Sequence, residues 1–124
     1  MSRALRESSV SRAVEEGTAS GPGDARFFRA LGDPTRLAII RLVLVRPRSV
    51  SELIAELGVP QSRVSNHLAC LRWCGFVTTE RRGRQVIYSI SDARLRRLLE
   101  LASEMARDNH ENLTATTRLG PDWL

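Results

Sequence analysis

The chain has 124 residues and a mass of 13.9 kDa, the size of one domain with short tails, and 42% of its residues are hydrophobic, as in a globular protein. It has no apolar run long enough to span a bilayer, no secretory signal pattern at its start and only two cysteines, so we expect no membrane partner and a reducing, cytoplasmic location. The formal net charge is +5, the pI is near 10.8, and every basic residue is an arginine.

The chain divides by sequence into an arm, a domain and a tail. A weak helical pattern at the start is followed by the turn-rich residues 17–24, so we expect residues 1–23 to form an N-terminal arm or a loosely docked helix with a linker. Residues 24–112 are the predicted folded domain, and residues 113–124 are the predicted C-terminal tail.

Two helices are expected at the beginning of the domain. The first is short, ends at Gly32 and has an apolar side formed by Phe27, Phe28 and Leu31. The second begins with Asp33 and Pro34, because an aspartate accepts hydrogen bonds from free first-turn amides and a proline is preorganised for the first helical position. It is apolar on most sides, which predicts a central core helix that ends before Pro47.

The next segments predict a helix-turn-helix. Residues 49–52 (S-V-S-E) begin a helix with an apolar stripe, and residues 58–60 (G-V-P) form a tight break. A further helix is expected from about Gln61 to Trp73, since apolar residues recur there at helical spacing. Two short helices joined by a three-residue turn that contains glycine are typical of a helix-turn-helix.

A hairpin is expected directly after these helices. Two runs rich in β-branched and aromatic residues, 76–79 and 85–90, flank the basic segment E-R-R-G-R, in which Gly83 supplies the turn. A helix-turn-helix followed by a hairpin with a basic tip is a winged helix. The predicted fold class is therefore mainly α with a small β-hairpin wing.

A last helix follows the wing and indicates a dimer. Ser91 and Asp92 are its expected cap, and its apolar positions are Leu95, Leu98, Leu99, Leu101, Ala102, Met105 and Ala106. The small core between the earlier helices and the wing cannot cover this face and the Phe27/Phe28 face as well. We therefore expect a homodimer through the first and last helices.

Several of these segments together resemble one family. They are F-F-R-A-L-G-D-P-T-R-L-A-I-I-R-L at 27–42, S-V-S-E-L-I-A-E-L-G-V at 49–59, S-N-H-L-A-C-L-R-W-C-G-F-V at 65–77 and R-R-G-R-Q-V-I-Y-S-I at 81–90. From about Ala25 to Ala106 the chain resembles the ArsR/SmtB family of bacterial metal- or stress-responsive winged-helix repressors. The resemblance implies a homodimer that binds operator DNA when free of inducer and releases it when the inducer binds.

The second helix of the helix-turn-helix is the predicted DNA-reading helix, because a helix of this kind enters the major groove of double-stranded DNA. The basic residues of the chain are concentrated in segments 24–50 and 60–84, as expected for phosphate contacts, although a solvated basic face has the same charge. Amide and arginine side chains suit bases, and serines suit phosphates. The predicted DNA-binding residues are Gln61, Ser62, Arg63, Ser65, Asn66 and His67 on this helix and Arg81, Arg82 and Arg84 on the wing.

The inducer is expected at the two cysteines. Cys70 and Cys74 lie four residues apart and thus on one face of the reading helix. The sequence around them resembles the cadmium- and lead-sensing CmtR branch of the family, which uses two cysteines at this spacing and a third from the C-terminal region of the dimer partner. This chain has no third cysteine, and His110 is the nearest replacement. Two thiolates and an imidazole favour soft or borderline ions. The resemblance implies Cd²⁺ or Pb²⁺, with Zn²⁺, Hg²⁺ and Cu⁺ as further candidates.

Other interpretations stay open beside this one. Both cysteines are expected to face the interior, where an unliganded cysteine packs as a small hydrophobic residue. The protein is then a winged-helix regulator without a metal, responding through thiol redox chemistry or another ligand, or a winged-helix module that binds proteins. The sequence contains no set of residues typical of an active site, so we expect no enzymatic activity and no catalytic residues.

Overall fold

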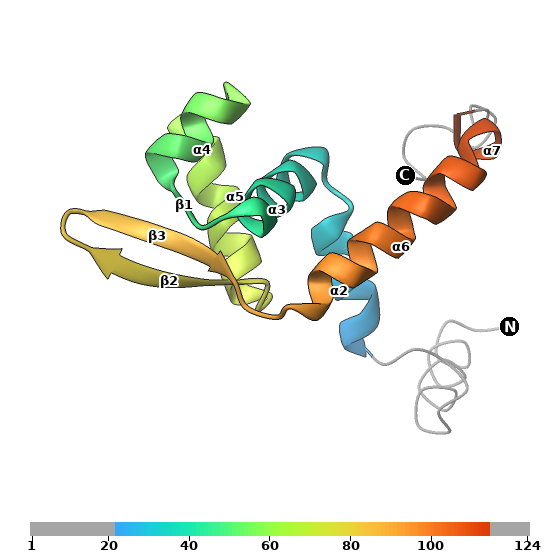
Figure 1. The fold of residues 1–124 in the computed structure, drawn as a ribbon, viewed down its shortest axis with the longest axis horizontal. Helices are drawn as coiled ribbons and strands as arrows, with labels where there is room; N and C mark the ends of the chain where they lie inside the picture. Colours follow the sequence, from blue (N-terminus) through green and yellow to red (C-terminus); the bar gives the residue numbers. More distant parts are fainter. Residues whose placement is uncertain (1–21, 115–124) are drawn as a thin grey trace, which may run out of the picture. The chain divides into compact units, whose positions relative to one another are not determined.

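The computed structural model describes residues 22–114, so most of the predicted N-terminal arm and of the predicted tail lies outside it (Figure 1). The chain consists of two compact units, and the boundary between them in the sequence lies between Ser91 and Asp92. The first unit contains α2 (Pro22–Leu31), α3 (Pro34–Val45), β1 (Arg48–Ser49), α4 (Val50–Leu57), α5 (Gln61–Trp73), β2 (Val77–Arg82) and β3 (Gln85–Ile90). The second contains α6 (Arg94–Asp108) and α7 (His110–Thr114).

The first unit is a winged helix, which confirms the predicted fold class. The helices α4 and α5 form the helix-turn-helix, and α4 ends at Gly58, whose φ of 65° lies in the left-handed region that favours glycine. The helix α5 has the bounds that the sequence predicts. The strands β2 and β3 project from the helices as the wing (Figure 1).

Two boundaries differ from the prediction. The strand β2 continues to Arg82, three residues beyond its expected end, because the residues of the basic segment pair in register with β3, up to Arg82 opposite Gln85. Only a short turn at Gly83 then remains between the strands, with a φ of 61° at the glycine. At the other end of the unit, α2 begins at Pro22, within the segment expected to be a linker.

The helix α3 is the centre of the core, as its apolar sequence predicts. The carboxylate of Asp33 caps its start by accepting a hydrogen bond from the backbone N of Arg36 at 2.9 Å. The helix packs against α2, α4, α5 and β3. The side chains that are fully buried in this core are Ile39, Ile40, Leu53, Val64, Leu68 and Leu71.

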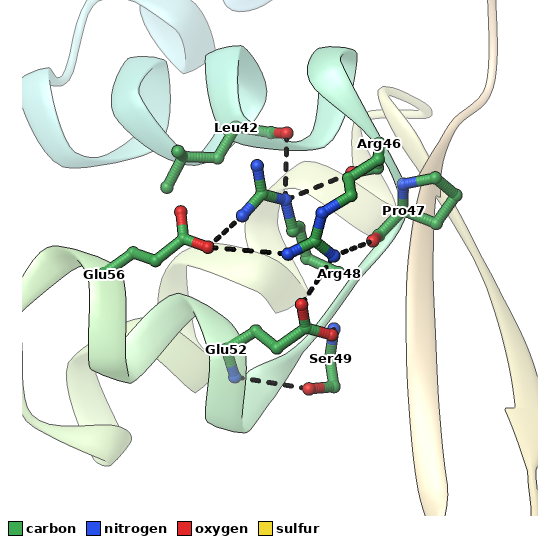
Figure 2. Close-up of polar contacts among 7 residues, drawn as sticks. All are labelled: Leu42, Arg46, Pro47, Arg48, Ser49, Glu52 and Glu56. Carbon is green, nitrogen blue, oxygen red and sulfur yellow. Dashed lines mark hydrogen bonds and ion pairs between the residues drawn. The ribbon is translucent and has the colours of Figure 1, made fainter.

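The sequence did not predict a third strand or a buried arginine. Arg48 and Ser49 form β1, which pairs with β3 to give a sheet of order β1-β3-β2. The side chain of Arg48 is buried, and its guanidinium contacts the carboxylate of Glu56 and donates to the carbonyl of Leu42 at 3.2 Å (Figure 2). This guanidinium therefore joins the last turn of α3 to α4 through β1.

The start of α4 is fixed beside this cluster. Ser49 and Glu52 form a capping box, in which each side chain bonds to the backbone N of the other residue. Arg46 also donates to the carboxylate of Glu52 at 2.6 Å, and this bond is the main cause of the lowered pKa of Glu52 (Figure 2). The ion pairs of Arg46 with Glu52 and of Arg48 with Glu56 thus hold α4 against the segment that precedes it.

The second unit begins with Asp92, which the sequence predicts as part of the cap of α6; the N-cap residue is instead Ala93, which makes no side-chain cap hydrogen bond. Asp92 accepts a hydrogen bond from the backbone N of Arg94 at 2.9 Å, and the guanidinium of Arg94 lowers the pKa of Asp92 to about 2. On α6, Leu101 and Met105 are more than half exposed. No helix within residues 22–114 is long and apolar enough to cross a bilayer.

The Arg48 cluster generates a prediction for stability. We expect Glu56→Ala to lower the free energy of unfolding by about 1–3 kcal/mol, because the buried guanidinium of Arg48 loses its charged partner. Urea denaturation at pH 7 measures this change. The matched control is Glu80→Ala, which removes an ion pair with Arg82 in which both side chains are 64% exposed, and we expect a loss below about 1 kcal/mol. Equal losses in the two variants would contradict the role of burial.

Candidate functional site

The exposed face of α5 carries a row of polar side chains. Val64, Leu68 and Leu71 are buried and fix which side of the helix faces the core. Five of the predicted DNA-reading residues lie on the exposed side: Gln61, Ser62, Arg63, Ser65 and Asn66. The start of α5 also has no side-chain cap, so its first-turn amides present the positive end of the helix dipole, which favours anions such as phosphate.

The wing adds exposed positive charge. Arg81, Arg82 and Arg84 are all exposed around the turn at Gly83. Arg82 pairs with Glu80 at 3.2 Å, and Arg81 donates from its Nε to the carbonyl of Gly83 at 3.5 Å. Because one carboxylate stands among three guanidinium groups, the tip of the wing keeps a net positive charge.

His67 differs from its neighbours on α5. Its side chain is only 17% exposed, and its Nε2 lies 3.8 Å from Oδ2 of Asp33. Its Nδ1 lies 3.4 Å from Nη1 of Arg36. The ring is therefore engaged with the start of α3, whereas Ser65 and Asn66 face outward. The expected contact of His67 with DNA stays a prediction.

Arg36 is a residue of this region that the sequence analysis missed. Its Nε donates to the carbonyl of Ala30 at 2.7 Å, and its Nη2 donates to the carbonyl of Arg29 at 3.2 Å. These carbonyls belong to the last turn of α2, where the carbonyl of Arg29 also accepts from the backbone N of Gly32 at 3.2 Å. The available sequence signal was its place in the first turn of α3, a few residues after the end of α2.

The two thiols lie together at the end of α5. Cys70 is half-buried, and Cys74 is the C-cap residue and is exposed, so the expectation that both face the interior is wrong for Cys74. A helix end leaves its last side chains on the surface even when earlier turns are buried. Neighbouring protein atoms still displace water from the sulfur, which raises the pKa of the Cys74 thiol, and the adjacent Cys70 raises it further. The charge of Arg36 opposes this rise.

The proposed third metal ligand belongs to the other unit. His110 begins α7 and is exposed. In the part of the chain from 22 to 114, no three side chains of His, Cys, Asp or Glu are grouped so that they could hold a metal ion. The structure of one chain thus offers two soft sulfur donors, which fit a soft ion but need a further ligand.

Trp73 is an exposed aromatic residue beside the thiols. Its side chain is 89% exposed at the end of α5, directly before Cys74. No sequence pattern indicated a role for it. An indole next to the thiol pair provides a fluorescence signal that responds to ligands bound there.

Comparison with known proteins identifies relatives among bacterial regulators. Residues 33–79 match the model of the family described as "Bacterial regulatory protein, arsR family". The chain is 44% identical to a probable mercury resistance operon repressor of Streptomyces lividans over 77% of this chain and 76% of the relative. It is 48% identical to the HTH-type transcriptional regulator CmtR of Mycobacterium bovis and Mycobacterium tuberculosis over 60% of this chain and 64% of that protein.

Solved structures have the same fold. The solution structure of a homodimeric winged helix-turn-helix DNA-binding domain from Mycobacterium bovis, a possible ArsR-family transcriptional regulator, matches with a TM-score of 0.64 and 30% identity over 71% of this chain and 81% of that one. The structure of the cadmium sensor CmtR from Mycobacterium tuberculosis matches with a TM-score of 0.54 and 47% identity over 61% of this chain and 79% of that one.

The Asp33 cap generates a pH prediction. The hydrogen bond from the backbone N of Arg36 is the main cause of the lowered pKa of Asp33, so its ionised form stabilises the folded state above the unfolded pKa, and this stabilisation is lost as the pH falls through the folded pKa. Asparagine is an equally good N-cap but does not titrate. We therefore expect the free energy of unfolding of wild type minus that of Asp33→Asn to decrease between about pH 6 and pH 2, measured by urea denaturation. A difference that is constant with pH would contradict this role for the carboxylate.

Proposed function

The chain belongs to the arsR family of bacterial regulatory proteins, and we propose that it is a homodimeric transcriptional repressor that binds operator DNA without metal and releases it when a soft metal ion binds at Cys70 and Cys74. The observation that carries the DNA-binding part is the exposed polar row on α5, next to a wing whose tip is positively charged. These two features fit a major groove and its flanking phosphates.

Each part of this surface suits a different contact with double-stranded DNA. The amides of Gln61 and Asn66 suit adenine, and Arg63 suits guanine. Ser62 and Ser65, near the uncapped start of α5, suit phosphates that fix the register of the protein. The wing residues that would reach flanking phosphates or the minor groove are Arg81, Arg82 and Arg84.

Exposed apolar side chains support the dimer. Phe28 on α2 is 61% exposed, and Leu101 and Met105 on α6 are also exposed in one chain. A second copy that covers both faces removes this apolar surface from water. It also gives two reading helices, as needed for operator half-sites about 34–36 Å apart.

The metal part of the proposal uses the thiol pair. Cys70 and Cys74 are adjacent sulfur donors, and one of them is open to solvent. His110 of the partner subunit is the proposed third ligand. Sulfur and imidazole donors favour soft or borderline ions. The resemblance to the CmtR branch makes Cd²⁺ or Pb²⁺ the proposed inducer, and Hg²⁺, Zn²⁺ and Cu⁺ are further candidates. The likeness to a mercury resistance repressor and to a cadmium sensor supports an inducer of this kind.

Release of DNA follows from where the thiols lie. A metal held at the end of α5 and by the partner's C-terminal region constrains the reading helix. A change of a few ångströms in the separation of the two reading helices then suffices to mismatch the half-sites. A coupling free energy of about 1–3 kcal/mol lowers operator affinity about 5–150-fold.

A thiol switch is the second candidate. The contact between Cys70 and Cys74 and the exposure of Cys74 also suit reversible oxidation of the pair. The raised pKa of Cys74 counts against it, because the thiolate is the reactive form. The same raised pKa also lowers metal affinity at neutral pH, because the thiol proton must leave when the metal binds. Metal binding is favoured because the similar proteins include a probable mercury resistance repressor and a cadmium sensor.

The DNA-binding part predicts a salt dependence. With a duplex selected from a random pool by the wild-type protein, we expect log Kd to rise linearly with log salt concentration. Arg84→Gln should reduce this slope by about 0.9, because one phosphate contact is lost. The control Arg26→Gln removes an exposed charge of α2 and should leave the slope nearly unchanged. Binding that is insensitive to salt would instead support a protein-interaction module.

The metal part predicts thiolate coordination. Titration with Cd²⁺ should produce a sulfur-to-metal charge-transfer band and quench Trp73, monitored in a Trp123→Phe background. The apparent affinity should increase between about pH 6 and pH 8, since binding releases thiol protons.

Cys70→Ser and Cys74→Ser should abolish the band, and His110→Gln should weaken binding. If Cd²⁺ gives the band but leaves operator affinity unchanged, the inducer role is wrong. If no band forms and oxidant alone releases the operator, the thiol switch is the mechanism.

A further inference from the structure

One guanidinium group meets three elements of the first unit. Arg36 stands in the first turn of α3, and two of its nitrogens donate to the carbonyls of Arg29 and Ala30 at the end of α2. A third nitrogen lies 3.4 Å from Nδ1 of His67 on α5. A single residue of α3, Arg36, therefore makes polar contacts with both α2 and α5.

Asp33, Arg36 and His67 lie close together. An arginine only donates, so a hydrogen bond between Arg36 and His67 requires Nδ1 of His67 to accept, with the ring proton on Nε2. That atom points to Oδ2 of Asp33 at 3.8 Å, and the same oxygen accepts the backbone N of Arg36 at 2.9 Å. The contacts of Arg36 with α2, and the placement of His67 beside both Arg36 and Asp33, restrict the rotation of these side chains.

The chemistry of this junction requires arginine. The carbonyls at the end of α2 carry the negative end of the helix dipole, which attracts a cation. A guanidinium reaches two carbonyls and an imidazole in different directions, whereas an ammonium group on a flexible stem does not hold all three in a fixed geometry. Arg36 also lies near enough to Cys74 for its charge to act on that thiol.

We propose that Arg36 is a positioning residue that fixes the direction of α5 relative to α2, and that it thereby sets the spacing between the two reading helices of the dimer. The inference rests on the proposed operator binding and on a dimer that includes α2. In such a dimer α2 lies at the interface, so any rotation of α5 against α2 moves both reading helices apart or together. Arg36 then determines which half-site spacing the protein accepts.

The test uses three duplexes. One is selected from a random pool by the wild-type protein, and the other two have one base pair added or removed between its half-sites. We expect wild type to bind the selected spacing most tightly. In Arg36→Gln and Arg36→Lys, the ratio of Kd between altered and selected spacing should fall at least about fivefold, the lower end of coupling between sites.

A matched variant separates positioning from charge. Arg26→Gln removes one exposed positive charge of α2 and should leave the Kd of each duplex, and therefore the ratio, nearly unchanged. His67→Ala keeps the contacts of Arg36 with α2 and removes only those with α5, so it should reduce the ratio as the Arg36 variants do. Thermal unfolding shows whether the Arg36 variants are folded. If they are not, the result for His67→Ala decides the test.

Two results would overturn the proposal. If the Arg36 and His67 variants weaken all duplexes equally, these residues contribute to stability or charge but do not position α5. If wild type binds the three spacings equally, no spacing is set. Absence of any salt-dependent DNA binding by wild type would reject the proposed function itself, and the positioning role with it.

Discussion

The buried guanidinium of Arg48 joins three elements of the first unit. The side chain of Arg48 is 6% exposed, and a charge removed from water to this degree must be paired and hydrogen-bonded. Its partners are Glu56 of α4 and the carbonyl of Leu42 in α3 (Figure 2). Because Arg48 lies in β1 and binds both partners, it connects the end of the core helix α3 to α4 of the helix-turn-helix.

The same point connects the helices to the wing. The backbone of Arg48 pairs with Tyr88, and Ser49 pairs with Ile87, so β1 anchors the hairpin through β3. Ser49 also caps α4. The two residues of β1 therefore pair with the wing through β3 and also fix the start of α4. This arrangement gives the basic wing tip and the polar face of α5 a fixed relation within one unit.

The core helix α3 has an arginine near each end with a related role. Arg48, just beyond its end, binds a carbonyl of α3, and Arg36, in its first turn, binds carbonyls of α2. Both guanidinium groups donate to carbonyls in the last turn of a helix, and each also reaches another element. The arginine-rich composition therefore contributes to the architecture as well as to the positive charge of the wing tip and the start of α5.

The sequence alone determined the elements whose signals are local. The cap of α3, the break at residues 58–60 and the spacing of apolar residues in α5 specified the helices, and the turn at Gly83 specified the hairpin, since each signal acts within a few residues. The tertiary structure decided which charges are buried and which polar residues face outward. The burial of Arg48, the contacts of His67 and the exposure of Cys74 depend on residues distant in sequence or on where a helix ends against its neighbours, and no local pattern encodes them.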